Sequence, residues 1–93
     1  MAQRARQQQP KSPQIADTLG WIYIKKNLSE EAIRIFKDVV VHDPDNPAFR
    51  YHYGMALLQK GDKASAKREL DLAMKNNPSK GDKVKIQALL QNL

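Results

Sequence analysis

A spacing of about 34 residues that recurs along the chain constrains its fold more than any other feature, because a fixed period of this length indicates a stack of similar structural units. Pro10, Pro44 and Pro78 follow one another at equal intervals. The same interval relates Ala5 to Val39 and Ala73, Leu19-Gly20 to Tyr53-Gly54, Tyr23 to Leu57, Ala32 to Ala66, and Phe36 to Leu70. Each unit is therefore expected to be the neighbour of the next.

Within each period, the apolar residues predict two amphipathic helices. Helices place residues three and four apart on one face, and the apolar residues follow that spacing. In the first period these are Ile15, Ala16, Leu19, Ile22 and Tyr23, then Ala32, Ile33, Phe36, Val39 and Val40. In the second they are Phe49, Tyr53, Ala56 and Leu57, then Ala66, Leu70, Ala73 and Met74. The chain is therefore expected to be all-α.

Turn and capping residues fall where these helices should end. Asn27 stands where the second period has Gly61, and both residue types suit a left-handed helix end. Ser29, followed by two glutamates, is predicted to cap the second helix. The segments 43–47 and 76–79 contain Pro, Asn and Asp residues that stop one helix and start the next.

Small residues indicate where the helices cross closely. Gly20, Ala32, Gly54 and Ala66 recur in register, and they allow a neighbouring backbone to approach where a larger side chain would hold it away. The large side chains of Phe36 and its equivalents are expected to fill the adjoining space.

These residues together resemble the tetratricopeptide repeat, a helix-turn-helix unit with the same period. The resemblance implies antiparallel helix-turn-helix repeats, stacked as a short right-handed solenoid. It implies a structural core made of Leu19, Gly20, Tyr23, Ala32, Phe36, Val39, Pro44, Tyr53, Gly54, Leu57, Ala66, Leu70, Ala73 and Pro78. The sequence departs from the family pattern at Ala16 and Arg50, where an aromatic residue is usual, at Tyr53 in place of leucine, and at Asn27 in place of glycine.

The period also divides the chain. Residues 13–46 and 47–80 are expected to form two repeats, and 81–93 a C-terminal capping helix with an atypical apolar register. Asp82 is predicted to be the N-cap residue of this last helix. Residues 1–12 are expected to be the end of a truncated preceding repeat and a linker, because Ala5 and Pro10 keep the register. A disordered basic tail is the alternative. Two repeats are fewer than the three usually needed for stability, so the capping helix is expected to support folding.

The resemblance also implies a binding surface, because the first helices of tetratricopeptide repeats line a concave face that takes extended peptides or partner helices. The expected lining residues are Asp17, Thr18, Trp21, Ile24 and Lys25 from the first repeat, and Tyr51, His52, Met55, Leu58 and Gln59 from the second. Trp, Tyr and Met give large contact areas at interfaces. Under a second interpretation, Trp21 and Met55 only contact neighbouring helices.

Other functions find little support in the residues. The chain has no cysteine, and its two histidines, His42 and His52, have no ligand partners at metal-binding spacing. No nucleophile, acid-base pair or phosphate-binding loop is recognisable, so neither an enzyme nor a cofactor is expected. The apolar runs are far shorter than the roughly 20 residues that span a membrane.

The net charge of +6 does not by itself indicate nucleic acid, since most cations alternate with acids as on a solvated helix face. The hypothesis is therefore a scaffold that binds a protein or peptide. Self-association through an apolar end is the first alternative, and a helical-repeat RNA binder is the second. Residues 16–21 and 50–56 further resemble the C-terminal part of long bacterial tetratricopeptide proteins associated with exopolysaccharide production and exosortase-type sorting.

Overall fold

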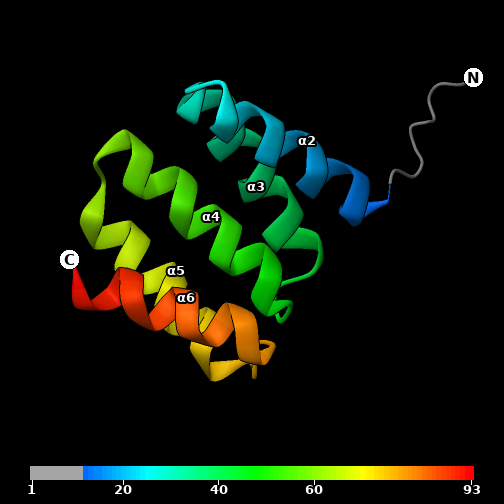
Figure 1. Ribbon diagram of the computed structural model, residues 1–93. Coiled ribbons are helices and arrows are strands. Elements are labelled where there is room, and N and C mark those ends of the chain that lie inside the picture. The colour runs from blue at the N-terminus through cyan, green and yellow to red at the C-terminus, as the bar shows by residue number, and fades with distance from the viewer. Residues whose placement is uncertain (1–11) are drawn as a thin grey trace, which may run out of the picture.

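The computed structural model describes residues 12–93, and this part of the chain consists of α-helices joined by short turns (Figure 1). The helices are α2 (Pro13–Lys25), α3 (Ser29–His42), α4 (Pro47–Lys60), α5 (Lys63–Lys75) and α6 (Lys80–Gln91). No β-strand occurs among the described residues, which confirms the prediction of an all-α structure. None of the helices in this part of the chain is both long and apolar enough to cross a membrane.

The helices stack in chain order. In Figure 1, α2 and α3 form one end, α4 crosses the middle, and α5 and α6 lie at the other end. Consecutive helices pack against each other, and α4 also contacts both α2 and α6. The two helix pairs lie within the predicted repeats 13–46 and 47–80. The expectation for residues 1–12 falls almost wholly outside the described residues.

The turns inside the two helix pairs are equivalent. Asn27 and Gly61, which are one period apart, both adopt the predicted left-handed conformation, with φ of 62° and 95°. Just beyond them, the amide of Leu28 donates to the carbonyl of Tyr23, and Asp62 donates to Leu57, each at 2.9 Å. This hydrogen bond satisfies a carbonyl that the end of a helix would otherwise leave unpaired.

Helix starts follow the expected capping chemistry at four places. Ser12, Asn46, Asp62 and Ser79 each accept a hydrogen bond from a backbone N–H of the first helical turn.

Two of the predicted caps are wrong. Ser29 is the first residue of α3 rather than its cap, and the cap position is held by Leu28, whose side chain makes no capping hydrogen bond. Asp82 lies in the first turn of α6 and donates its backbone N–H to Ser79 Oγ at 3.2 Å. The acidic side chains of α3 and α6 still lie in the first turn, where they oppose the helix dipole.

Both pairs cross at a glycine. A Cβ atom added to Gly20 would lie 2.6 Å from the ring of Phe36, and one added to Gly54 would lie 2.8 Å from Leu70. These distances are shorter than van der Waals contact, so only glycine allows each crossing. The two glycines are thus in equivalent environments, as the sequence period predicts.

The core is a chain of small clusters between helices. Ala32, Phe36 and Ala56 form one cluster, Val39, Val40 and Phe49 form a second, and Tyr51, Leu70, Ala73 and Ile86 form a third. Gly20, Gly54, Leu57 and Ala66 are buried, and Tyr23 and Tyr53 are partly buried. The third cluster joins α4, α5 and α6, so α6 is an integral part of the fold.

Three residues of the predicted core lie elsewhere. Leu19 is 43% exposed and lines a surface hollow on α2 together with Ile15 and Ile22. Pro44 is exposed and Pro78 is partly buried. Both prolines belong to the connections between helix pairs, where proline stops a helix rather than filling a core.

A partly buried ion pair occupies a position where the family usually has an aromatic residue. Arg50 Nη1 donates to Glu69 Oε1 at 2.7 Å, and its Nε donates to the carbonyl of Pro44 at 3.0 Å. Arg50 therefore holds α4 to α5 and also to the turn before α4. At position 50, the ion pair with Glu69 therefore replaces the aromatic contact that is usual in the family.

Candidate functional site

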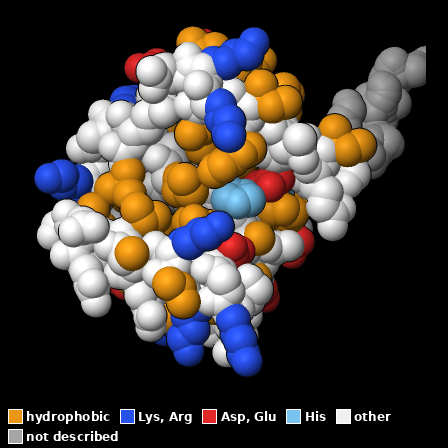
Figure 2. All heavy atoms as spheres, viewed as in Figure 1, with side chains coloured by type: hydrophobic (Ala, Val, Ile, Leu, Met, Phe, Trp, Pro, Cys, Tyr) orange, Lys and Arg blue, Asp and Glu red, His pale blue; other side chains and the backbone are white. Residues whose placement is uncertain are grey.

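One face of the molecule is shared by α2, α4 and α6, which are not consecutive along the chain. Figure 2 shows this face, with hydrophobic side chains gathered across its middle, beside a histidine and between lysine or arginine side chains. We call this face the groove and define it by Asp17, Trp21, Ile24, Lys25, His52, Met55, Leu58, Gln59, Lys85 and Leu89.

The contribution of α2 is centred on Trp21. This side chain is partly buried, and Lys25 Nζ lies 5.7 Å from the centre of its ring. A cation at this distance is attracted to the face of an indole. Ile24 packs on the cluster that contains Phe36 and Ala56, so the apolar side of α2 is continuous with the core.

A side-chain hydrogen bond joins α2 to α4 at one side of the groove. His52 Nδ1 lies 2.8 Å and 2.9 Å from the two carboxylate oxygens of Asp17. An ionised carboxylate only accepts hydrogen bonds, so Nδ1 carries the proton. The His52 ring centre is 5.2 Å from that of Trp21 and 5.3 Å from that of Tyr51. The histidine is therefore fixed in orientation by its surroundings.

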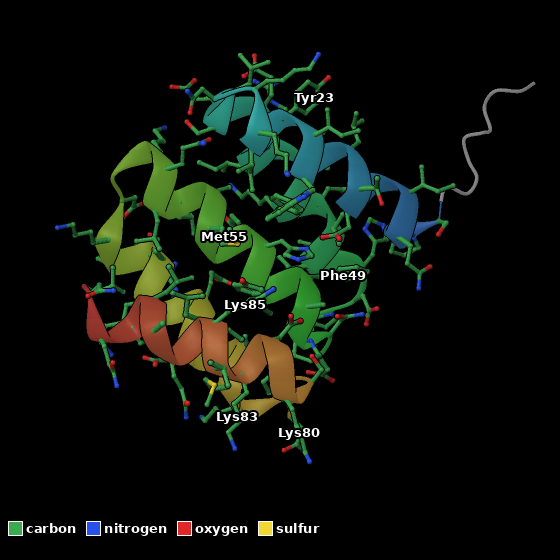
Figure 3. The ribbon with its side chains drawn as sticks, in the orientation of Figure 1. Tyr23, Phe49, Met55, Lys80, Lys83 and Lys85 are labelled. Carbon is green, nitrogen blue, oxygen red and sulfur yellow. The ribbon has the colours of Figure 1, made fainter. Side chains whose placement is uncertain are left out.

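The middle and far side of the groove come from α4 and α6. Met55, Leu58 and Leu89 are partly buried and pack against the cluster beneath them. Figure 3 shows Lys85 between α6 and α4, on the same side of the molecule as Met55. The groove therefore combines an apolar floor with a lysine near each side, Lys25 on α2 and Lys85 on α6.

Gln59 lies at the end of the groove and ties the two helix pairs together. Its amide nitrogen donates to the carbonyl of Ile24 at 2.9 Å and to Asn27 Oδ1 at 3.1 Å. These two hydrogen bonds hold α4 against the C-terminal end of α2.

The structure corrects two of the ten predicted lining residues. Tyr51 is only 6% exposed, because α6 packs over it and places Ile86 against the same cluster. Thr18 lies with Ile15, Leu19 and Ile22 on the outer face of α2, and its hydroxyl donates to the carbonyl of Gln14 at 2.9 Å. The expectation that these two side chains are available in the groove is therefore wrong.

Two groove residues are missing from the sequence interpretation. Lys85 and Leu89 lie one period after Tyr51 and Met55, so the period itself contains the signal. The sequence analysis does not use this relation, because it treats residues 81–93 as a capping helix whose apolar residues fall outside the period. In the structure, α6 packs against both α5 and α4.

Within residues 12–93, no three His, Asp or Glu side chains come together as a metal site would require. The hydrogen bonds between Asp17 and His52 join these two side chains to each other and bring no serine or threonine hydroxyl to the pair in the described part of the chain.

Comparison with known proteins agrees with this geometry. A family model described as tetratricopeptide repeat matches residues 29–93. No match was found among the curated proteins or among the solved structures. The match begins at the first residue of α3, but α2 makes the same glycine crossing and the same left-handed turn as α4. The chain belongs to the tetratricopeptide repeat family.

Proposed function

We propose that this chain is a non-catalytic module that binds a segment of a partner protein across the groove. Tetratricopeptide repeats are generally protein–protein interaction modules. The proposal rests on the partly buried side chain of Trp21 on α2, whose ring centre lies 5.2 Å from that of His52 on α4. Helix α4 also carries the partly buried side chains of Met55 and Leu58.

The partner segment needs apolar anchor residues. Large apolar side chains that are already ordered by the core can bind a partner with little further loss of rotamer freedom, which favours affinity. An extended peptide or one face of an amphipathic helix could reach from Trp21 across Met55 to Leu89. Because Asp17 holds His52 Nδ1, the other ring nitrogen, Nε2, is the one that can contact the partner.

The proposal can be tested with a peptide selected from a random phage-displayed library against the full chain. We expect Trp21→Ala and Met55→Ala each to weaken binding of the selected peptide at least about tenfold, which corresponds to about 1.4 kcal/mol. Isothermal titration calorimetry measures the affinities, and the melting temperature of each variant shows whether it is folded.

Val41→Ala provides the matched control. Val41 is an apolar residue on α3 that is 70% exposed and lies outside the groove. Its truncation should leave the affinity unchanged. Equal loss of affinity in all three variants, or no loss in the two groove variants, would contradict the proposal.

A further inference from the structure

His52 is a polar side chain in a largely apolar part of the groove. Within residues 12–93, only one of its two ring nitrogens has a hydrogen-bond partner, because Nδ1 lies 2.8 Å and 2.9 Å from the two carboxylate oxygens of Asp17. The side chain of Asp17 is 15% exposed, whereas that of His52 is 21% exposed. The other ring nitrogen, Nε2, is therefore the atom through which this side chain can bind something else.

Asp17 determines what kind of hydrogen bond Nε2 can make. An ionised carboxylate only accepts, so Nδ1 carries the proton, and in a neutral imidazole Nε2 then has a lone pair and no proton. A turn of the ring that exchanged the two nitrogens would give up both contacts with Asp17. The ring centres of Trp21 and Tyr51 lie 5.2 Å and 5.3 Å from that of His52 and surround the ring further. Nε2 is thus a hydrogen-bond acceptor in a fixed place.

A partner that covers this part of the groove has to supply a donor to Nε2. In the open groove, solvent can hydrate the atom. A partner that replaces solvent with an apolar group, or with a second acceptor, leaves a buried acceptor unsatisfied and binds more weakly. Sites built around a hydrogen bond reject ligands that lack the matching group more strongly than apolar sites do. His52 therefore adds a requirement that the apolar floor of the groove does not have.

The other polar side chains of the groove have different roles. Lys25 and Lys85 can only donate hydrogen bonds. The two oxygens of Asp17 already contact His52. Gln59 contributes a second acceptor, its carbonyl oxygen, but at the end of the groove, where its amide nitrogen donates to Ile24. Near Trp21, the groove thus offers one fixed acceptor on His52 and donors on the two lysines.

An extended polypeptide matches this arrangement better than a helix does. Each residue of an extended segment other than proline presents a backbone N–H donor and a carbonyl acceptor. In a helix, these groups bond to one another except in the first and last turns. A helix lying across the groove would therefore bring apolar side chains to Trp21 without a backbone donor for Nε2.

We propose that His52 selects an extended segment of the partner protein over a helical one, by accepting a hydrogen bond at Nε2 from a backbone N–H of that segment. Asp17 sets this preference, because it holds the proton of the ring on Nδ1. His52 is then a specificity-determining residue, and Asp17 acts through it as a positioning residue. This inference rests on the proposed function, since it needs a partner in the groove.

NMR of the histidine ring nitrogens in the ¹⁵N-labelled chain tests the position of the proton. The spectra are recorded at about pH 8.5, above the range in which histidines ordinarily take up a second proton. We expect the proton of His52 on Nδ1. In Asp17→Asn, we expect much of it on Nε2, because an amide can donate to Nδ1. A proton on Nε2 in the original chain would overturn the inference.

The peptide selected for the proposed function tests the effect on binding at the same pH. Asp17→Asn should weaken its binding about tenfold or more, because Nε2 then meets the peptide N–H with a proton of its own. Asp38→Asn is the matched control, since Asp38 lies 3.8 Å from His42 on α3, outside the groove. It removes the same charge from another Asp–His pair and should leave the affinity unchanged.

A series of peptides, each N-methylated at one backbone amide, tests the donor without any change in the protein. At one position, the methyl group should weaken binding to the original chain about tenfold or more, because it removes the N–H that Nε2 accepts. The same methyl group should cost at most about twofold against Asp17→Asn, where that hydrogen bond is already lost. Such non-additivity identifies two groups that contact each other.

The inference and the proposed function can fail separately. Equal effects of Asp17→Asn and Asp38→Asn, or the absence of an N-methyl position whose effect depends on Asp17, would overturn the inference. A peptide that transferred NOEs show to be helical when bound would overturn it as well. All three results would leave the proposed function standing as long as Trp21→Ala and Met55→Ala weaken binding.

Discussion

Single residues set the distance between the helices of each pair. The ring of Phe36 and the side chain of Leu70 lie directly over Gly20 and Gly54, so even one methyl group has no room at either glycine. A helical glycine usually costs about 0.5–1 kcal/mol relative to alanine. Here the close crossing outweighs that cost, which explains why both positions have glycine despite its low helix propensity.

We therefore predict that Gly54→Ala destabilises the protein by about 1–3 kcal/mol, because the added methyl group forces Leu70 or the helix backbone to shift. Urea denaturation followed by circular dichroism measures the effect. Gly81→Ala is the control, because a Cβ atom there meets nothing within 4 Å. That substitution should be neutral or slightly stabilising, and a loss at Gly81 as large as that at Gly54 would contradict the crossing argument.

Tyr51 gives the fold a dependence on alkaline pH. Burial raises the pKa of its phenol above 10.0, and the negative charge of Asp82 raises it further. The folded state thus favours the neutral phenol, which contributes stability that is fully present below pH 10 and is lost as the pH rises through the folded pKa.

The expected result is a fall in the urea midpoint between pH 9 and pH 11. Tyr51→Phe should show a smaller fall, because phenylalanine has no ionisable group to keep neutral. Part of the fall should remain in this variant, since burial also raises the pKa of Tyr53. An identical pH dependence in both proteins would show that the Tyr51 phenol is not held neutral by the fold.

At the scale of elements, α6 is the helix that differs most from its sequence interpretation. The sequence predicts a cap, and α6 does cover the third cluster through Ile86, which is fully buried. It also supplies Lys85 and Leu89 to the groove and buries Tyr51. The sequence could not show that α6 lies over Tyr51, because burial depends on which face of α4 a later helix covers.

Ile86→Ala is predicted to destabilise the chain by about 2–5 kcal/mol, as expected for a large buried side chain replaced by alanine. Val84→Ala on the same helix is the control, because Val84 is 66% exposed.

Removal of residues 81–93 should abolish cooperative thermal unfolding by exposing Tyr51 and Leu70. A sharp, unchanged transition after that removal would show that α6 is dispensable for the fold.

The helix boundaries show where local sequence rules hold and where they fail. The left-handed turns at Asn27 and Gly61 were predictable, because few residue types adopt that conformation. The caps predicted at Ser29 and Asp82 are misplaced by a few residues, since serine and aspartate also suit the first turn of a helix. Local rules thus locate a boundary but do not fix which residue begins the helix.

For the whole molecule, the period predicts the number, order and pairing of the helices, because each interval specifies a complete helix pair. The resemblance to tetratricopeptide repeats, rather than the period, places Trp21 and Met55 on the expected binding face. The interpretation fails at Leu19 and Tyr51, whose exposure depends on whether a neighbouring helix covers them, and at Thr18, which lies on the outer face of α2. Whether a helix face is covered depends on the neighbouring helices in the stack, and the sequence of a single repeat does not contain this information.

We propose that α2, α4 and α6 together form one binding face. The most direct measurement is an amide chemical-shift map of the ¹⁵N-labelled chain, titrated with the selected peptide. We predict that the shifted amides cluster on the groove, around Trp21, Met55 and Leu89, with little change around Val41 on α3 or Asp71 on α5. Shifts concentrated on α3 and α5, with the groove unaffected, would contradict the claim.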